Sequence, residues 1–291
     1  MNSDNNILYR LLKLFPVQTL RENFLVKTKT QNSIINEIVQ KYQPEEIYNF
    51  SYNFFNYTRQ HIYFFINDNK NLNLFESPLL SSVPLFKNNK TDSEITQFYF
   101  YNTTYSVIIV ADGDNFSREN IDFKVPMKIT ITKNYLRLEF TIIEKNISAY
   151  INTSNRIINF SKTIDEKYIL LKLKSESPKF KELNPYDLNR GIKYLWKNDI
   201  IDSPFVKWKK SRSTSTEAMD EEFTLKEQYP ELFDEIIYAP LKRTIFNIRN
   251  GDKYSYNHFI SEPSEGEISF TTFAKNKDAK ENVIDQILTN N

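Results

Sequence analysis

The spacing of apolar residues changes near His61, and no other feature constrains the fold of this chain as much. Up to that point, apolar residues recur three and four positions apart, which is the spacing of one face of a helix. Beyond it the period falls towards two, and β-branched and aromatic residues dominate, as they do in half-buried strands. The pattern predicts an α+β protein in which a small helical N-terminal unit precedes a central, largely antiparallel β-sheet.

The N-terminal segment predicts four short amphipathic helices. Pro16 suits the start of the second helix, and the polar run 30–33 supplies N-cap candidates for the third. The fourth helix is expected over 44–56, because Glu45 and Glu46 suit a first turn and the apolar residues after them share one face. These helices are expected to form a first domain over 1–58.

Short strands are predicted in a second domain, 59–175. Polar linkers such as 133–134 and 144–146 separate several of them, so consecutive strands are expected to pair as antiparallel hairpins. The predicted strands cover 62–66, 97–101, 106–110, 124–132, 136–143, 147–151, 156–160 and 168–173.

The character of the sequence changes again after Ser175, where prolines punctuate a charged region. Helices and extended segments alternate there, which gives a third region of mixed helix and strand over 176–291. We expect this region to pack on the sheet. Its predicted helices cover 185–198, 225–237 and 278–288, and its predicted extended segments cover 244–248 and 267–273.

Composition excludes several classes of function. The chain has no cysteine, which removes disulfides, thiolate nucleophiles and cysteine-ligated metal centres. Its four glycines are isolated, so no glycine-rich loop can bind nucleotide phosphates, and neither of its two histidines has a partner at metal-ligand spacing. The chain has 38 basic and 37 acidic side chains, so its net charge is close to zero and any attraction of nucleic acid must come from a local patch.

The sequence predicts a cytoplasmic protein that does not contact a membrane. Its longest apolar runs, such as 62–66 and 107–111, are far shorter than the roughly 20 residues that cross a bilayer. Arg10 and Lys13 interrupt the apolar residues near the N-terminus, which breaks up the apolar core that a signal peptide needs. The absence of cysteine fits a reducing compartment.

Asp112 and Asp114 follow the apolar run 107–111, and two functions fit them. Carboxylates at the end of a strand can hold one hard cation, and Glu139 from a neighbouring strand could add a ligand. This would give a metal-dependent nuclease or a related phosphoryl-transfer enzyme that requires Mg²⁺ or Mn²⁺. We favour the other interpretation, a hairpin turn, because Asp-Gly is a preferred turn pair and no helical crossover follows.

A basic segment over 207–212 is the strongest candidate for contact with nucleic acid. Cations neutralise backbone phosphates, hydroxyl groups donate hydrogen bonds to them, and an indole can stack on a base. Acidic residues at 217–222 could pair with these cations, in which case the segment is a self-neutralising surface loop. The candidate residues are Lys207, Trp208, Lys209, Lys210 and Arg212.

A second candidate lies in the N-terminal unit, where Lys27 and Lys29 alternate with Thr28 and Thr30 between two amphipathic helices. This layout resembles the SAP-type helix–extended loop–helix modules that bind DNA, although the glycine expected in that loop is missing. The resemblance implies DNA contact through Lys27 and Lys29. Packing between small helices explains the same layout.

Aromatic residues are denser than one core face requires in 48–57 and 98–101. Consecutive aromatic residues on a strand point to both faces of its sheet, so a second layer or a partner must cover each face. A core between domains and an interaction surface are both consistent with this pattern.

These observations favour a non-catalytic binding or scaffolding protein that contacts nucleic acid or a partner protein and needs no cofactor. The composition bias and the lack of metabolic motifs suggest a mobile-element or antiviral-defence complex as its setting. The metal-dependent enzyme is the alternative, and a structural subunit of a larger assembly is a third reading. Whether the chain forms an oligomer or joins a multi-subunit complex stays open at this point.

Overall fold

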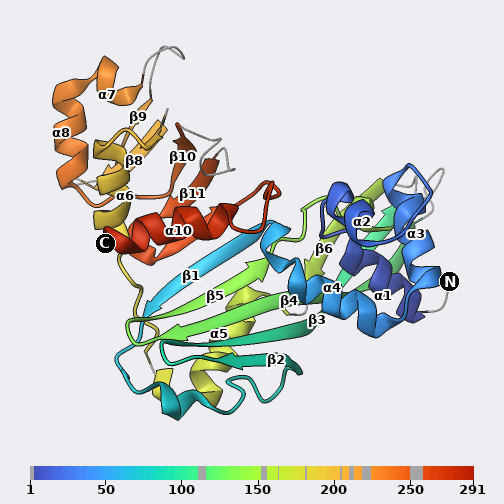
Figure 1. Ribbon diagram of the computed structural model, residues 1–291. Coiled ribbons are helices and arrows are strands. Elements are labelled where there is room, and N and C mark those ends of the chain that lie inside the picture. Colours follow the sequence, from blue (N-terminus) through green and yellow to red (C-terminus); the bar gives the residue numbers. More distant parts are fainter. Residues whose placement is uncertain are drawn as a thin grey trace. The chain divides into compact units, whose positions relative to one another are not determined.

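The computed structural model confirms the predicted α+β class, since four helices precede the first strand and the strands pair in antiparallel fashion (Figure 1). The residues that the structure describes are 3–110, 116–151, 156–162, 164–180, 182–203, 205–209, 213–217, 224–249 and 258–291.

The chain forms two compact units, and each of them is assembled from three separate stretches. The predicted division into 1–58, 59–175 and 176–291 stays a prediction. The first unit contains Met1–Thr58, Asn71–Lys133 and Phe140–Glu182. The second unit contains Arg59–Lys70, Asn134–Glu139 and Leu183–Asn291.

The four predicted N-terminal helices are present in the first unit. α3 (Gln31–Lys41) begins after Thr30, whose hydroxyl accepts a hydrogen bond from the Ser33 amide at 3.3 Å. The polar run therefore caps this helix as the sequence predicted. The other three helices are α1 (Ser3–Leu12), α2 (Val17–Asn23) and α4 (Pro44–Asn53).

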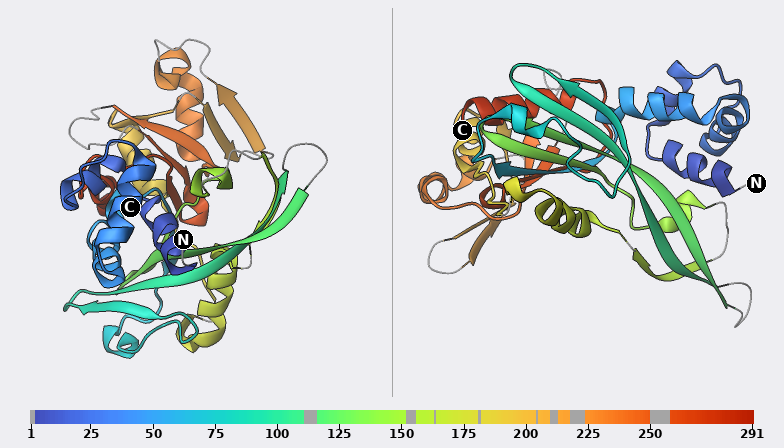
Figure 2. Two further views of the ribbon diagram at one scale, coloured as in Figure 1. Left: turned by 90° about the vertical axis from the view of Figure 1, so that its right-hand side faces the viewer. Right: turned by 90° about the horizontal axis from the view of Figure 1, so that it is seen from below.

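Two long strands form the main hairpin of the first unit. β3 (Glu94–Val110) and β4 (Phe116–Thr132) pair from end to end in one unbroken register. Figure 2 shows the two strands running side by side over their whole length. The separate strands predicted over 97–101 and 106–110 are therefore one strand, because the polar residues between them continue the same hydrogen-bonded ladder.

β3 has a second set of partners on its other edge. β2 (Leu85–Lys90) pairs with the first part of β3, and β6 (Arg156–Lys162) pairs with its last part. The strand predicted over 156–160 is thus confirmed, within slightly wider bounds. β2 was not predicted, since its second half is a run of polar residues without alternation.

The aromatic run 98–101 is buried on both faces of β3 inside the first unit. Phe98 packs edge-to-face on Tyr52, with ring centroids 5.2 Å apart. Tyr99 points to the opposite face, where its hydroxyl accepts a hydrogen bond from the Leu79 amide at 3.0 Å. These four side chains belong to a core, so the interaction-surface interpretation is wrong for them.

Two predicted strands of this unit are wrong. The run 168–173 lies in helix α5 (Glu166–Glu176), and 147–151 begins with the 3-10 turn η3 (Ile147–Tyr150). Asp165 caps α5, because its carboxylate accepts a hydrogen bond from the amide of the third helical residue at 2.8 Å. A short apolar run is compatible with a strand or a helix, and here the Asp165 cap favours the helix. The remaining 3-10 turns are η1 (Phe55–Tyr57), η2 (Leu72–Phe75) and η4 (Pro178–Phe180).

The second unit contains a sheet in the order β5-β1-β12-β11-β10-β7. The last two residues of β5 belong to the first unit. A separate hairpin is formed by β8 (Phe205–Lys209) and β9 (Ser213–Glu217). The strands of the larger sheet are β1 (Gln60–Ile66), β5 (Tyr135–Thr141), β7 (Ile201–Asp202), β10 (Thr244–Ile248), β11 (His258–Glu262) and β12 (Glu267–Phe270).

The helix predicted over 225–237 is divided in two at Pro230, because proline lacks the amide that would continue the first helix. The helices predicted over 185–198 and 278–288 are confirmed within a few residues. No helix in the described part of the chain is both long and apolar enough to cross a membrane. The helical elements of this unit are α6 (Asn189–Lys197), α7 (Leu225–Gln228), α8 (Pro230–Tyr238), α10 (Ala279–Thr289) and the turn η5 (Pro263–Glu265).

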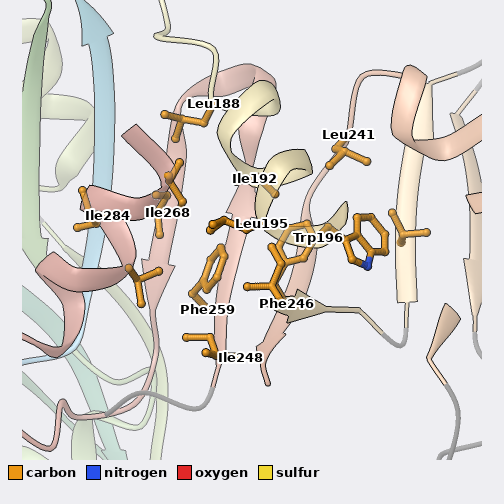
Figure 3. Packing of buried hydrophobic residues seen from close by; sticks show 14 of the residues in the cluster. Leu188, Ile192, Leu195, Trp196, Leu241, Phe246, Ile248, Phe259, Ile268 and Ile284 are labelled. Atoms are coloured by element: carbon orange, nitrogen blue, oxygen red, sulfur yellow. The ribbon is translucent and has the colours of Figure 1, made fainter. Parts of the chain in front are cut away.

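Trp196 of α6 lies in the hydrophobic core of the second unit (Figure 3). Its ring contacts Phe233 of α8 and Phe246 of β10, with centroids 5.1 and 5.5 Å apart. Its indole nitrogen donates a hydrogen bond to Asp202 at 3.3 Å, which satisfies the polar end of the ring. This packing ties α6 to α8 and to the sheet.

Candidate functional site

The described part of the predicted basic segment, 207–209, lies on a β-strand. Lys207, Trp208 and Lys209 belong to β8, which pairs with β9 in one register. Lys210 and Arg212 lie outside the described residues. Alternate residues of a strand point to opposite sides, so Trp208 does not share a face of β8 with Lys207.

Burial of Trp208 contradicts its predicted stacking on a base. Its side chain is only 2% exposed and belongs to the core of the second unit, where its backbone bridges to Leu241. Lys207 is exposed, and its amide donates to the Thr244 hydroxyl at 3.5 Å. Phosphate contact by Lys207 stays a prediction.

Lys27 and Lys29 lie on an exposed, extended loop between α2 and α3. The Glu37 carboxylate holds this loop by accepting hydrogen bonds from the amides of Lys27 and Thr28 at 3.1 and 3.3 Å. The bond from the Lys27 amide is the main cause that lowers the pKa of Glu37. A carboxylate therefore offsets part of the positive charge of the loop, and DNA contact there stays a prediction.

The suggested metal ligands do not form a site in the described part of the chain. Asp112 and Asp114 lie outside it, and no group of three potential ligands occurs within it. Glu139 is buried beside Arg137, with 2.8 Å between carboxylate and guanidinium, and Glu281 binds the same guanidinium through two bonds of 2.7 Å. Burial acts to lower the pKa of Arg137, but the two carboxylates outweigh it and raise this pKa.

A cationic surface that the sequence analysis did not predict lies on α6. One face of this helix, which includes Trp196, is buried in the core. Residues three and four positions apart lie side by side on a helix, and the outer face of α6 carries cations at this spacing together with a tyrosine. The side chains are those of Arg190, Lys193, Tyr194 and Lys197.

Contacts near the start of α6 hold this face in place. Asp187 accepts hydrogen bonds from the amide and the side chain of Asn189, at 2.8 and 2.7 Å. The Gly191 amide donates to the Asn291 side chain at 3.0 Å. Gly191 also lies against α10, where a Cβ atom would stand 2.0 Å from the Ile287 carbonyl oxygen. The outer side chains of α6 therefore project from a fixed backbone.

The outer face of α6 lines an open cavity of about 820 Å³, which we call the α6 cavity. Tyr238, the last residue of α8, completes the wall, and Figure 1 shows α8 beside α6. Arg190, Lys193 and Lys197 are its cations, and Asp187 has the only acidic side chain among its described lining residues. These side chains carry a formal charge of +2.

The cavity is electrostatically suited to an anion. Partial burial lowers the pKa of Lys193, Asp187 acts to raise it and Lys197 acts to lower it, and the net result is a lowered pKa. Within the described residues, none of the three cations of the cavity forms an ion pair. A bound anion would offset the repulsion between Lys193 and Lys197, so the site favours a negatively charged ligand.

Two exposed tyrosines accompany these cations. The side chain of Tyr194 is 46% exposed and that of Tyr238 is 83% exposed. The Lys197 ammonium lies 5.2 Å from the centroid of the Tyr238 ring, which is a cation–π distance. Cations next to an accessible aromatic ring are the groups that bind the phosphates and bases of nucleic acid.

A sequence signal for this site exists but is weak. Arg190, Lys193 and Lys197 recur at helical spacing within the predicted helix 185–198, yet such charged faces are usually no more than solvated surface. The second wall, with Tyr238, comes from a helix much later in the chain. Only the tertiary structure brings the two together.

No family model, curated protein or solved structure matches the chain. The case for a function therefore rests on the geometry and charge of the α6 cavity.

Proposed function

We propose that this protein is a non-catalytic nucleic-acid-binding protein and that the α6 cavity is its contact surface. The observation that carries this proposal is the meeting of three cations and two exposed tyrosines at one open cavity. Cations bind backbone phosphates whatever the sequence, and tyrosine rings contact bases. The cytoplasmic location and the defence-associated setting inferred from composition are part of the same proposal.

The charge distribution of the whole chain supports a local contact. The formal net charge is only +1, so long-range attraction by the protein as a whole is small. The cations of the α6 cavity are not consumed by ion pairs within the described residues. They can therefore exchange water and counterions for phosphate oxygens without breaking an existing bridge.

The first prediction concerns these cations. Replacing Arg190, Lys193 and Lys197 together by glutamine should weaken binding of a fluorescent oligonucleotide and flatten its salt dependence. Each phosphate contact contributes roughly 0.7 to 0.9 to the slope of log affinity against log salt, so the slope should fall by about 2. Fluorescence anisotropy titrations at several salt concentrations measure both quantities.

Two controls accompany this variant. The first neutralises the loop cations through Lys27→Gln and Lys29→Gln, and a loss of binding there alone would move the contact to the loop between α2 and α3. The second control removes the same number of exposed cations from the first unit, through Lys145→Gln, Lys167→Gln and Lys174→Gln, and should leave binding unchanged.

Absence of oligonucleotide binding by the unmodified protein at low salt would refute the proposal.

A further inference from the structure

We infer that the α6 cavity selects single-stranded nucleic acid by stacking an unpaired base on Tyr238, with Tyr194 of α6 as a second ring in the same cavity. This inference rests on the proposed function and adds the form of nucleic acid that the site accepts. It follows from the exposure of the two rings, from the rigidity of the helices that carry them, and from the size of the cavity.

The packing of α8 does not depend on Tyr238. Ile236 and Ile237, the two residues before it, are buried in the core and anchor the end of the helix. Single exposed aromatic residues are common on protein surfaces and mean little alone. Here, however, the ring lines a cavity and has a lysine ammonium 5.2 Å from its centroid. Both a stacking surface and a phosphate ligand are therefore present at one point.

The two helices that carry the rings are locked together. Trp196 of α6 and Phe233 of α8 pack edge-to-face in the core, with centroids 5.1 Å apart and ring planes at 86°. Tyr194 and Tyr238 project from the outer sides of these same helices. A ligand therefore meets rings that are already in position, and little conformational entropy is lost on binding.

A double helix does not offer the faces of its bases to such rings. Bases in a duplex are covered above and below by their neighbours, and a side chain reaches only their edges and the backbone. An unpaired base exposes its face and stacks on aromatic side chains. The cavity of about 820 Å³ has the size of a small-molecule site, which suits nucleotides of one strand.

The cations of α6 form a row that can follow one backbone. Arg190 and Lys197 are seven residues apart, which is about 10 Å along the helix axis, and Lys193 lies between them. A strand whose base stacks on Tyr238 would place a phosphate next to Lys197 and continue towards Arg190. The tyrosines thus provide the preference for unpaired bases, and the cations provide affinity that does not depend on base sequence.

Direct competition between strand forms tests this inference. Anisotropy titrations at fixed salt would use one labelled sequence as single strand and as annealed duplex, in DNA and in RNA. We expect tighter binding of the single strand by at least one of the two chemistries. Tyr238→Leu should weaken single-strand binding about tenfold and leave duplex binding unchanged, because stacking on one ring is of this size. Tyr238→Phe retains the ring and should retain the preference.

An abasic probe separates stacking from charge. A strand without bases keeps every phosphate, so it should bind the unmodified protein no more tightly than the normal strand binds the Tyr238→Leu variant. The same variant should lose no further affinity for the abasic strand, since a removed ring and a removed base break the same contact. The matched control is Tyr168→Leu, which removes a partly exposed tyrosine from α5 and should change no affinity.

The outcomes distinguish this inference from the proposed function. Equal affinity for single strand and duplex, unaffected by Tyr238→Leu but reduced when the three cations are replaced, would overturn the inference and leave nucleic-acid binding standing. No binding of any probe at low salt would overturn both and point to a protein partner. Circular dichroism of each variant checks that the fold is retained, as expected for a ring that is 83% exposed.

Discussion

Two glycines of the second unit lie where backbone segments approach too closely for any side chain. At Gly191, a Cβ atom would stand 2.0 Å from the Ile287 carbonyl oxygen of α10. At Gly266 the backbone is left-handed, with φ at 66°, and a Cβ atom would stand 2.3 Å from the Phe64 carbonyl oxygen. The obstacles are backbone atoms, which cannot move aside without moving a helix or a strand.

The close approach at Gly191 gives a prediction at the residue scale. Gly191→Ala should destabilise the protein by about 1–3 kcal/mol, because the added methyl group forces α6 away from α10. Helix propensity acts in the opposite direction, since alanine is favoured over glycine inside a helix by about 1 kcal/mol. The free energy of unfolding, measured with urea, reports which effect is larger.

A control for this variant is available on the partner helix. Gln286→Ala changes an exposed residue of α10 and should alter the free energy of unfolding by no more than about 0.5 kcal/mol. A Gly191→Ala protein as stable as the unmodified one, or more stable, would show that α6 and α10 do not meet in the way the structure has them.

At the scale of elements, periodicity was a reliable guide where one face of an element is buried. It predicted α1 to α4, α6 and α10 for this reason. It failed for α5, where a short apolar run was compatible with two structures and the Asp165 cap decided between them. The α6 cavity could not be predicted, because its walls come from helices that are distant in the chain and meet through Trp196 and Phe233.

The buried tyrosines of β3 give a prediction at this scale. Burial raises the pKa of Tyr99 and of Tyr105 to about 12, against an ordinary value of 10.0. The folded state therefore holds these protons more tightly than the unfolded state, so the associated stability is complete below pH 10 and is lost as pH rises through about 12. Ionisation of each tyrosine should lower the free energy of unfolding by about 2 kcal/mol once the pH reaches about 12.

Urea unfolding at a series of alkaline pH values measures this loss, and near-ultraviolet absorbance reports the ionisation of tyrosine. Tyr105→Phe keeps a buried ring without an ionisable hydroxyl, so its loss of stability over the same range should be smaller by about 2 kcal/mol. Ionisation of all tyrosines in the folded protein at their ordinary pKa would contradict the burial of these hydroxyl groups.

At the scale of the whole molecule, neither compact unit is a continuous piece of chain. The stretch 183–291 contributes most of the second unit, including every described residue that lines the α6 cavity. Its core nevertheless includes Ile62 and Phe64 of β1, which come from a much earlier part of the sequence. Site and core therefore have different boundaries along the chain.

This discontinuity predicts the behaviour of a fragment. Residues 183–291 expressed alone should show no cooperative unfolding transition and no oligonucleotide binding that depends on Tyr238, because the core lacks β1 and β12 lacks a partner strand. Circular dichroism during urea unfolding and anisotropy titration check both points. A fragment that unfolds cooperatively and binds as the full chain does would show that β1 is dispensable.

The pairing of β1 with β12 delays completion of the sheet while the chain is being synthesised. Gln60 lies opposite Phe270, so 210 positions separate two residues that face each other in one sheet. Ribosomes add about 5–20 residues per second, so this edge of a newly made β1 waits about 10–40 s for its partner. During that interval the strand can pair with other chains. We therefore expect the speed of synthesis, and not the sequence alone, to affect how many chains complete the native sheet.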